Sequence, residues 1–210
     1  MTRVIDLVNK GYLHATAGEC PVERQPRMVA KFHERYGIGL TPAQVFYRKQ
    51  QGLANAKLVI FRPLRDDGLL RAQWLLLATP GQGLIHEVES LRSVMEAPYL
   101  NWLGYELVRQ TKPGGLTWTW RRPKLGMAEC YAELDAYLKQ RATDKIALCL
   151  ARFANQPGFA GVRTQSFALF EYAKRHGYLG EVPYIPYMEK IAHGEPMLIT
   201  VASDTGKRGK

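Results

Sequence analysis

Residues 116–122 alternate in a way that commits the middle of the chain to a β-hairpin. Their sequence, Leu-Thr-Trp-Thr-Trp-Arg-Arg, puts Leu116, Trp118 and Trp120 on one face of a strand and the residues between them on the other. The four residues before them, Lys-Pro-Gly-Gly, are typical of a turn, and residues 102–111 alternate like a partner strand. The chain is therefore predicted to contain an antiparallel sheet.

A second pair of strands is predicted upstream of this hairpin. Residues 57–62 form the first, and residues 71–79 are almost continuously apolar, which is typical of a central strand. Asp66-Asp67-Gly68 between them predicts a turn, and Pro80-Gly81-Gln82-Gly83 ends the second strand. Residues 84–91 then carry apolar side chains at helical spacing. The middle of the chain is thus predicted as ββαββ.

The N-terminal third of the chain has the apolar spacing of helices. Three helices are predicted, over residues 4–13, 22–36 and 42–51. Gly37 is expected to end the second helix, and Thr41 is expected to cap the third.

The C-terminal third is predicted as helical again. Residues 125–140 form an amphipathic helix, Asp144 caps another that runs to about residue 155, and Thr164 opens a third that ends near residue 176. A proline-rich stretch over residues 182–187 precedes one more short helix. We therefore expect an α+β fold, with a mostly antiparallel sheet of about four strands flanked by N-terminal and C-terminal helices.

No stretch of the sequence has the composition of a linker between domains. The prediction is a single α+β domain over residues 1–202 and a flexible basic tail over residues 203–210. A boundary near residue 124, with a separate helical C-terminal half, is the alternative.

The charge of the chain is strongly basic, and it is spread evenly. The formal net charge is +10, from 29 basic and 19 acidic residues, and each third of the sequence carries a similar excess. Such a balance favours an acidic partner, either nucleic acid or an acidic protein surface. Apolar runs are too short for a membrane helix, and the N-terminus lacks a signal core, so a cytoplasmic protein without membrane insertion is expected.

The cysteines do not predict a disulfide framework. Cys20, Cys130 and Cys149 are odd in number and far apart, and no two of them form a Cys-x-x-Cys pair. Cys130 and Cys149 lie in helical apolar patterns, where each is interpreted as a small buried hydrophobic residue.

Motifs for catalysis are incomplete in this sequence. Residues 80–83 lie between a strand and a helix, as a phosphate-binding loop would, but they lack the Gly-Lys-Ser/Thr ending. His86 and Glu89 share a helix face without a third ligand at metal-binding spacing, and no Gly-x-Ser-x-Gly occurs. We therefore expect no catalytic residue, no metal ligand, no cofactor and no enzymatic activity.

The hairpin carries the residues that we predict to bind a partner. They are the two tryptophans of its second strand and three neighbouring arginines: Arg109, Trp118, Trp120, Arg121 and Arg122. Such residues can stack bases and grip phosphates, or anchor a protein interface. The alternative interpretation is that both tryptophans line the core and the arginines are solvated strand ends.

Residues 161–165 open a helix after another helix and a short turn, which is similar to a helix-turn-helix motif. Gln165 and Ser166 would stand at the start of the reading helix. The mostly apolar residues that follow make a poor base-reading face, so simple helix packing is the favoured interpretation.

Three stretches together resemble proteins carried by conjugative plasmids. They are WLLLATPGQGLIHE at residues 74–87, GYELVRQT at residues 104–111 with TWTWRR at residues 117–122, and PGFAGVRTQ at residues 157–165. Chain size and basic character are similar to fertility-inhibition proteins of the FipA type. The resemblance implies an inhibitor that reduces transfer of a coresident plasmid by covering a surface of the type IV coupling ATPase. A basic nucleic-acid-binding accessory protein of a plasmid or phage, in replication control or relaxosome assembly, is the alternative.

Overall fold

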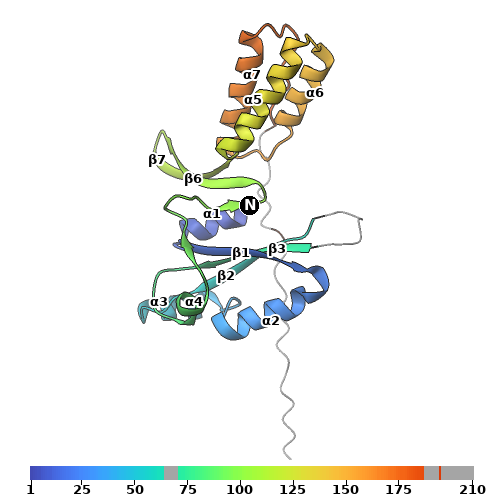
Figure 1. The fold of residues 1–210 in the computed structure, drawn as a ribbon. Coiled ribbons are helices and arrows are strands. Elements are labelled where there is room, and N and C mark those ends of the chain that lie inside the picture. Colours follow the sequence, from blue (N-terminus) through green and yellow to red (C-terminus); the bar gives the residue numbers. More distant parts are fainter. Residues whose placement is uncertain (64–70, 187–193, 195–210) are drawn as a thin grey trace, which may run out of the picture. The chain divides into compact units, whose positions relative to one another are not determined.

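The computed structural model describes residues 1–63, 71–186 and 194. These residues group into two compact units, which divide between Val94 and Met95 (Figure 1). We call residues 2–94 the N-terminal unit and residues 95–186 the C-terminal unit. The single domain over residues 1–202 and its alternative, a boundary near residue 124, stay predictions.

The N-terminal unit is an antiparallel four-stranded sheet with helices on both faces. Its strand order is β2-β3-β1-β4, and Figure 1 shows α1 over one face and α2 over the other. The elements are α1 (Thr2–Asn9), β1 (His14–Pro21), the 3-10 turn η1 (Val22–Arg24), α2 (Gln25–Tyr36), α3 (Pro42–Gln50), β2 (Ala56–Phe61), β3 (Arg71–Ala78), α4 (Leu84–Val88) and β4 (Arg92–Ser93).

Strand β1 is a correction to the sequence analysis, which predicted only helices in this third of the chain. β1 lies inside the sheet, paired with β3 along its whole length and with β4 at its start. Its sequence, HATAGECP, has no large aliphatic or aromatic side chain and so gives no strand signal by alternation. The strand forms because its small residues fit against the apolar strand β3, which contributes the fully buried Leu75, Leu76 and Leu77.

Most of the other predicted elements of this unit are confirmed, although the first helix ends at Asn9 and not near residue 13. β2 and β3 lie where the pattern placed them, and β3 is central. Helix α2 buries Val29, Phe32 and Tyr36 against the sheet and ends at Gly37, which adopts the left-handed conformation. Thr41 caps α3, and Gln44 completes the reciprocal pair of capping hydrogen bonds.

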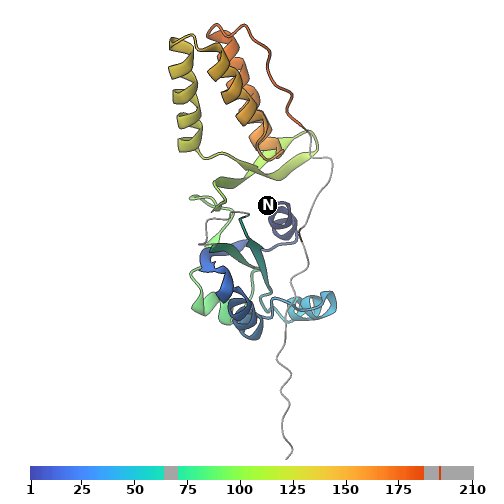
Figure 2. The same cartoon turned by 90° about the vertical axis from the view of Figure 1, so that its right-hand side faces the viewer.

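The C-terminal unit combines a three-stranded antiparallel sheet with three helices. The sheet order is β5-β6-β7, and the three helices pack side by side (Figure 2). The elements are β5 (Asn101–Trp102), β6 (Tyr105–Lys112), β7 (Gly115–Arg121), α5 (Lys124–Lys139), α6 (Thr143–Ala154) and α7 (Ala160–Arg175).

The predicted hairpin is confirmed, and the structure gives its register. Lys112 pairs with Gly115 across the turn, Arg109 pairs with Trp118, and Leu107 pairs with Trp120. The first strand is shorter than predicted because residues 103 and 104 have positive φ angles and turn the chain between β5 and β6. The fold is therefore α+β with antiparallel sheets, as predicted. Its strands form two sheets among the described residues, where one sheet of about four strands was expected.

The helical layer has its own core, and two helix starts differ from the prediction. Leu134 of α5, Leu150 of α6 and Leu169 of α7 are fully buried together. Asp144 lies in the first turn of α6, one residue inside the helix, and does not cap it. Helix α7 begins at Ala160, four residues before Thr164.

Glycine at position 161 explains that early start. A Cβ there would lie 2.6 Å from the carbonyl oxygen of Trp120, so only glycine lets the first turn of α7 touch β7. The Gly161 amide donates to the Thr119 hydroxyl across this contact, at 3.0 Å.

Three predictions fall outside the described residues. They are the turn at Asp66-Asp67-Gly68, the short helix after residue 187, and the basic tail over residues 203–210. Among the residues that the structure does describe, no helix combines the length and apolar composition that crossing a bilayer needs.

Candidate functional site

Arg109 and Trp118 form a stacked pair on the β6–β7 hairpin. They face each other in the register, and the Arg109 guanidinium carbon lies 5.1 Å from the centre of the Trp118 ring. Arg109 is exposed and Trp118 is half-buried. Leu116, which precedes Trp118 on the same face of β7, is 63% exposed. We call Arg109, Leu116 and Trp118 the hairpin face. The stack is worth about 0.5–1 kcal/mol at an exposed site, so it favours this position of the guanidinium over others.

Two other predicted binding residues lie inside the C-terminal unit. Trp120 is 0% exposed, with its ring 6.4 Å from that of Trp102, and Arg122 is 7% exposed. The Arg122 guanidinium donates to the carbonyl oxygens of Val162 and Phe153 and to the Ser166 hydroxyl. Burial lowers the pKa of this guanidinium. For Trp120 the geometry matches the alternative interpretation, in which the tryptophans line the core. Arg122 matches neither interpretation, because both expected this arginine to be exposed and it is buried.

Arg121 is held by a carboxylate on the neighbouring strand. Its Nε lies 2.8 Å from Glu106 Oε1, and the two residues are register partners on β7 and β6. Its positive charge is therefore largely balanced within the sheet, which leaves Arg109 as the cation of the hairpin face.

The residues considered for a DNA-reading helix face inward. The Gln165 side chain accepts from the Arg122 amide at 2.7 Å and donates to the Arg122 carbonyl at 2.9 Å. Ser166 is 1% exposed, and its hydroxyl donates to the Phe153 carbonyl. The start of α7 thus fastens the helix to the end of β7, in agreement with simple helix packing.

His86 and Glu89 do not converge on a shared site. His86 Nε2 lies 2.9 Å from the Thr79 carbonyl oxygen, and its ring meets His14 edge to face. Glu89 instead accepts a 2.5 Å hydrogen bond from the Tyr36 hydroxyl. Burial and the Glu89 carboxylate raise the pKa of Tyr36 to about 12. His86 and Glu89 are therefore bonded to different neighbours.

The loop at residues 80–83 packs against the chain near residue 53. The Gln82 amide donates to the Gly52 carbonyl, and the Gln82 carbonyl accepts from the Ala54 amide. A Cβ on Gly81 would come within 2.7–2.9 Å of this backbone. The loop is the ordinary tight connection that the sequence favoured over a phosphate-binding loop.

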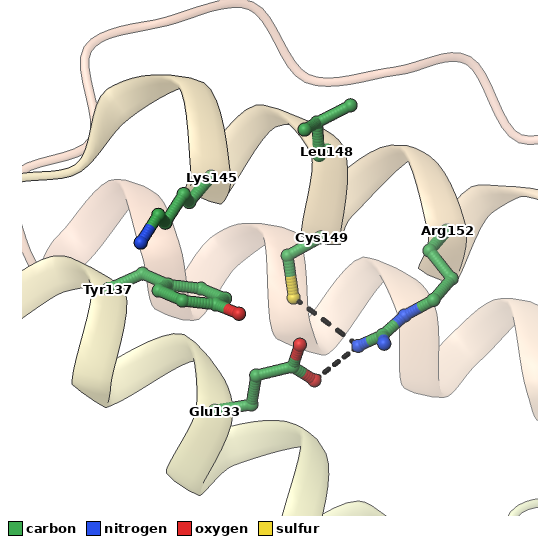
Figure 3. A pocket seen from close by; sticks show the side chains of 6 residues that line it. All are labelled: Glu133, Tyr137, Lys145, Leu148, Cys149 and Arg152. Atoms are coloured by element: carbon green, nitrogen blue, oxygen red, sulfur yellow. Dashed lines mark hydrogen bonds and ion pairs between the residues drawn. The ribbon is translucent and has the colours of Figure 1, made fainter.

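A small hollow between α5 and α6 was not anticipated from the sequence (Figure 3). Its volume is about 240 Å³. The Arg152 guanidinium donates to both the Glu133 carboxylate and the Cys149 sulfur. Burial, followed by the Glu133 charge, raises the pKa of Cys149 to about 11, so the thiol is protonated at neutral pH. The lining residues are Glu133, Tyr137, Lys145, Leu148, Cys149 and Arg152.

This hollow offers neither a nucleophile nor a metal site. A protonated thiol is a poor nucleophile, and its arginine already has a carboxylate partner. Throughout the described part of the chain, no three His, Cys, Asp or Glu side chains lie close enough together to hold a metal ion. The residues that line the hollow are spaced by three or four positions on α5 and α6. This spacing was the sequence signal that could have placed them on facing sides of the two helices.

No protein family, no curated protein and no solved structure matches this chain. The resemblance to fertility-inhibition proteins therefore stays a prediction.

Proposed function

We propose that this protein works by binding another macromolecule through the hairpin face. The observation that carries this proposal is the Arg109–Trp118 stack at the exposed end of a hairpin whose base is buried. Along one face of β7, exposure runs from 0% at Trp120 to 63% at Leu116. The base anchors the strand, and the tip presents an aromatic ring, a leucine and a guanidinium to solvent.

Such a face suits recognition because it is organised before a partner arrives. Trp and Arg are the residues that most often anchor interfaces, and a rigid aromatic loses little conformational entropy on binding. The stack favours one position of the guanidinium, which lowers part of the cost of ordering a long side chain. A stable complex needs about 800 Å² from each partner, so the hairpin face would form the centre of a larger contact.

The partner that we propose is the type IV coupling ATPase of a coresident conjugative plasmid. The support is the resemblance carried by residues 74–87, 104–111, 117–122 and 157–165, together with the net charge of +10, which suits an acidic protein surface. The inhibitor acts in the cytoplasm by occlusion: it covers a surface that the ATPase needs for hexamer assembly or substrate docking.

A nucleic-acid-binding accessory protein is the second candidate, because an arginine stacked on tryptophan also suits bases and phosphates. The two candidates differ in their response to salt. Binding to nucleic acid weakens steeply as salt rises, because phosphate contacts release counterions. Binding to a protein through Leu116 and Trp118 depends less on salt.

A nuclease-treated pull-down from cells that carry a conjugative plasmid tests the proposal. We expect the full-length protein to retain the coupling ATPase after nuclease treatment, and Trp118→Ala to retain much less. Leu125→Ala is the control, because Leu125 is an exposed residue of α5, outside the hairpin. Retention that disappears with nuclease would instead support the nucleic-acid candidate.

A further inference from the structure

Helix α3 of the N-terminal unit presents its aromatic side chains to solvent. Phe46 is 63% exposed and Tyr47 is 61% exposed, and no residue of α3 is buried. Helices that pack on a sheet normally turn their large apolar residues inward. Here the inward positions are taken by Val45 and Arg48, which are partly buried. Helix α3 therefore presents its two aromatic side chains to solvent, opposite to the usual orientation of a helix on a sheet.

Polar tethers hold α3 in this orientation. Asn55 is 1% exposed, and its side-chain amide donates to the Val45 carbonyl. Arg48 reaches under the helix to the Ala54 carbonyl, at 2.8 Å. Lys57 of β2 donates to the carbonyls of Ile38 and Leu40, just before the helix begins. Such bonds fix the position and rotation of α3, which its apolar contacts alone would not do.

The chain around α3 carries only positive charge. No acidic residue occurs between Glu34 and Asp66, a stretch that contains Arg48, Lys49, Lys57 and Arg62. Lys49 is exposed and follows Phe46 by three residues, so the two share one face of the helix. An apolar surface with a cation beside it complements a segment that combines apolar and acidic side chains.

We propose that Phe46, Tyr47 and Lys49 form a docking surface for an acidic, apolar segment of a partner protein. The surface lies in the N-terminal unit, so it is separate from the hairpin face and does not depend on the function proposed for that face. A protein is favoured over nucleic acid because this face offers one exposed lysine beside two rings, while Arg48 is already bonded. Affinity for nucleic acid rests mainly on several phosphate contacts.

Peptide binding to the full-length protein tests this surface. The probe is a fluorescent peptide of about five helical turns, with leucine at the i, i+3, i+4 spacing and glutamate elsewhere. Its control has lysine in place of every glutamate, and a single-stranded oligonucleotide of similar length is the third ligand. Affinity is measured by fluorescence anisotropy.

We expect the acidic peptide to bind and the lysine peptide to bind far more weakly. The double variant Phe46→Ala with Tyr47→Ala should weaken acidic-peptide binding by about tenfold or more, as loss of an aromatic anchor does. Phe61→Ala removes another exposed aromatic ring of the same unit and should leave the affinity unchanged.

A charge reversal keeps the test valid if the double variant folds poorly. Lys49→Glu retains both rings, so it should weaken the acidic peptide and strengthen the lysine peptide. The proposal is overturned if the acidic peptide fails to bind, if Phe61→Ala weakens it as much as the double variant, or if Lys49→Glu has no effect. Oligonucleotide binding that is lost in the double variant, without peptide binding, would also overturn it in favour of a nucleic-acid surface.

Discussion

Gly18 of β1 and Trp74 of β3 face each other in the sheet, and the indole ring occupies the space where a side chain at position 18 would lie. A Cβ built on Gly18 would stand 2.4 Å from Cζ2 of Trp74. The indole ring also contacts Phe32 of α2, and the centres of the two rings lie 5.3 Å apart in an edge-to-face arrangement. One glycine therefore lets a tryptophan join the sheet to α2.

Gly18→Ala should destabilise the protein by about 1–3 kcal/mol, because the indole must shift out of a packed position. Urea unfolding followed by circular dichroism measures the change. Gly126→Ala is the matched control: position 126 lies in α5, and a Cβ there would make only an ordinary van der Waals contact with Pro123, at 3.9 Å, so alanine should stabilise by about 0.5–1 kcal/mol. Trp74→Phe in the Gly18→Ala background should recover part of the loss, and equal stability of wild type and Gly18→Ala would contradict the account.

Arg122 is expected to matter for stability much more than its neighbour Arg121. Arg122→Met leaves buried acceptors from Val162, Phe153 and Ser166 without this donor, at a cost of about 2–4 kcal/mol. Arg121→Met removes a partly exposed ion pair and should cost less than about 1 kcal/mol. Thermal unfolding of both variants gives the comparison. The reverse order would show that Arg122 is not part of the core.

Substitutions of the two tryptophans of β7 should affect different properties: Trp120 should matter for stability and Trp118 for partner binding. Trp120→Ala removes a fully buried ring and should destabilise the protein by about 3–5 kcal/mol. Trp118→Ala removes a half-buried ring at the exposed end of the hairpin and should change stability by only about 1 kcal/mol, while it weakens partner binding. Unfolding and pull-down measurements on both variants check this. If Trp118→Ala keeps full partner binding, Trp118 does not contribute to recognition of the partner.

The Tyr36–Glu89 hydrogen bond should make part of the stability depend on alkaline pH. The folded-state pKa of Tyr36 is raised from 10.0 to about 12. Its contribution is therefore fully present below pH 10 and is lost as the pH rises through about 12. At pH 7, Tyr36→Phe should lose about 1–2 kcal/mol, and the gap to wild type should close between these two pH values.

Urea unfolding at a series of pH values measures that gap. Tyr47→Phe, at an exposed tyrosine of α3, is the control and should show little change at any pH. A gap between wild type and Tyr36→Phe that is constant up to pH 12 would argue against the raised pKa.

The sequence predicted the elements whose signals are local. The Lys-Pro-Gly-Gly turn and the alternation around Trp118 predicted the hairpin, because turn chemistry and side-chain period act within a few residues. Thr41 and Gln44 located the start of α3 for the same reason.

The features that were missed depend on contacts between distant residues. β1 has no local strand signal, and its place in the sheet depends on pairing with β3, far along the chain, where Gly18 leaves room for the Trp74 ring. The burial of Arg122 follows from acceptors on α6 and α7, which lie 31–44 residues away. Of the predicted binding residues, pattern alone placed Trp118 and Trp120 on one face but could not tell which end of that face is covered.

The measurement that tests the central claim most directly is the affinity of the purified protein for the purified cytoplasmic part of a coupling ATPase, at low and at high salt. We expect binding that survives high salt and drops about tenfold or more with Trp118→Ala, while Leu125→Ala binds like wild type. Absence of binding, or equal binding by Trp118→Ala and wild type, would contradict the proposal that the hairpin face recognises this partner.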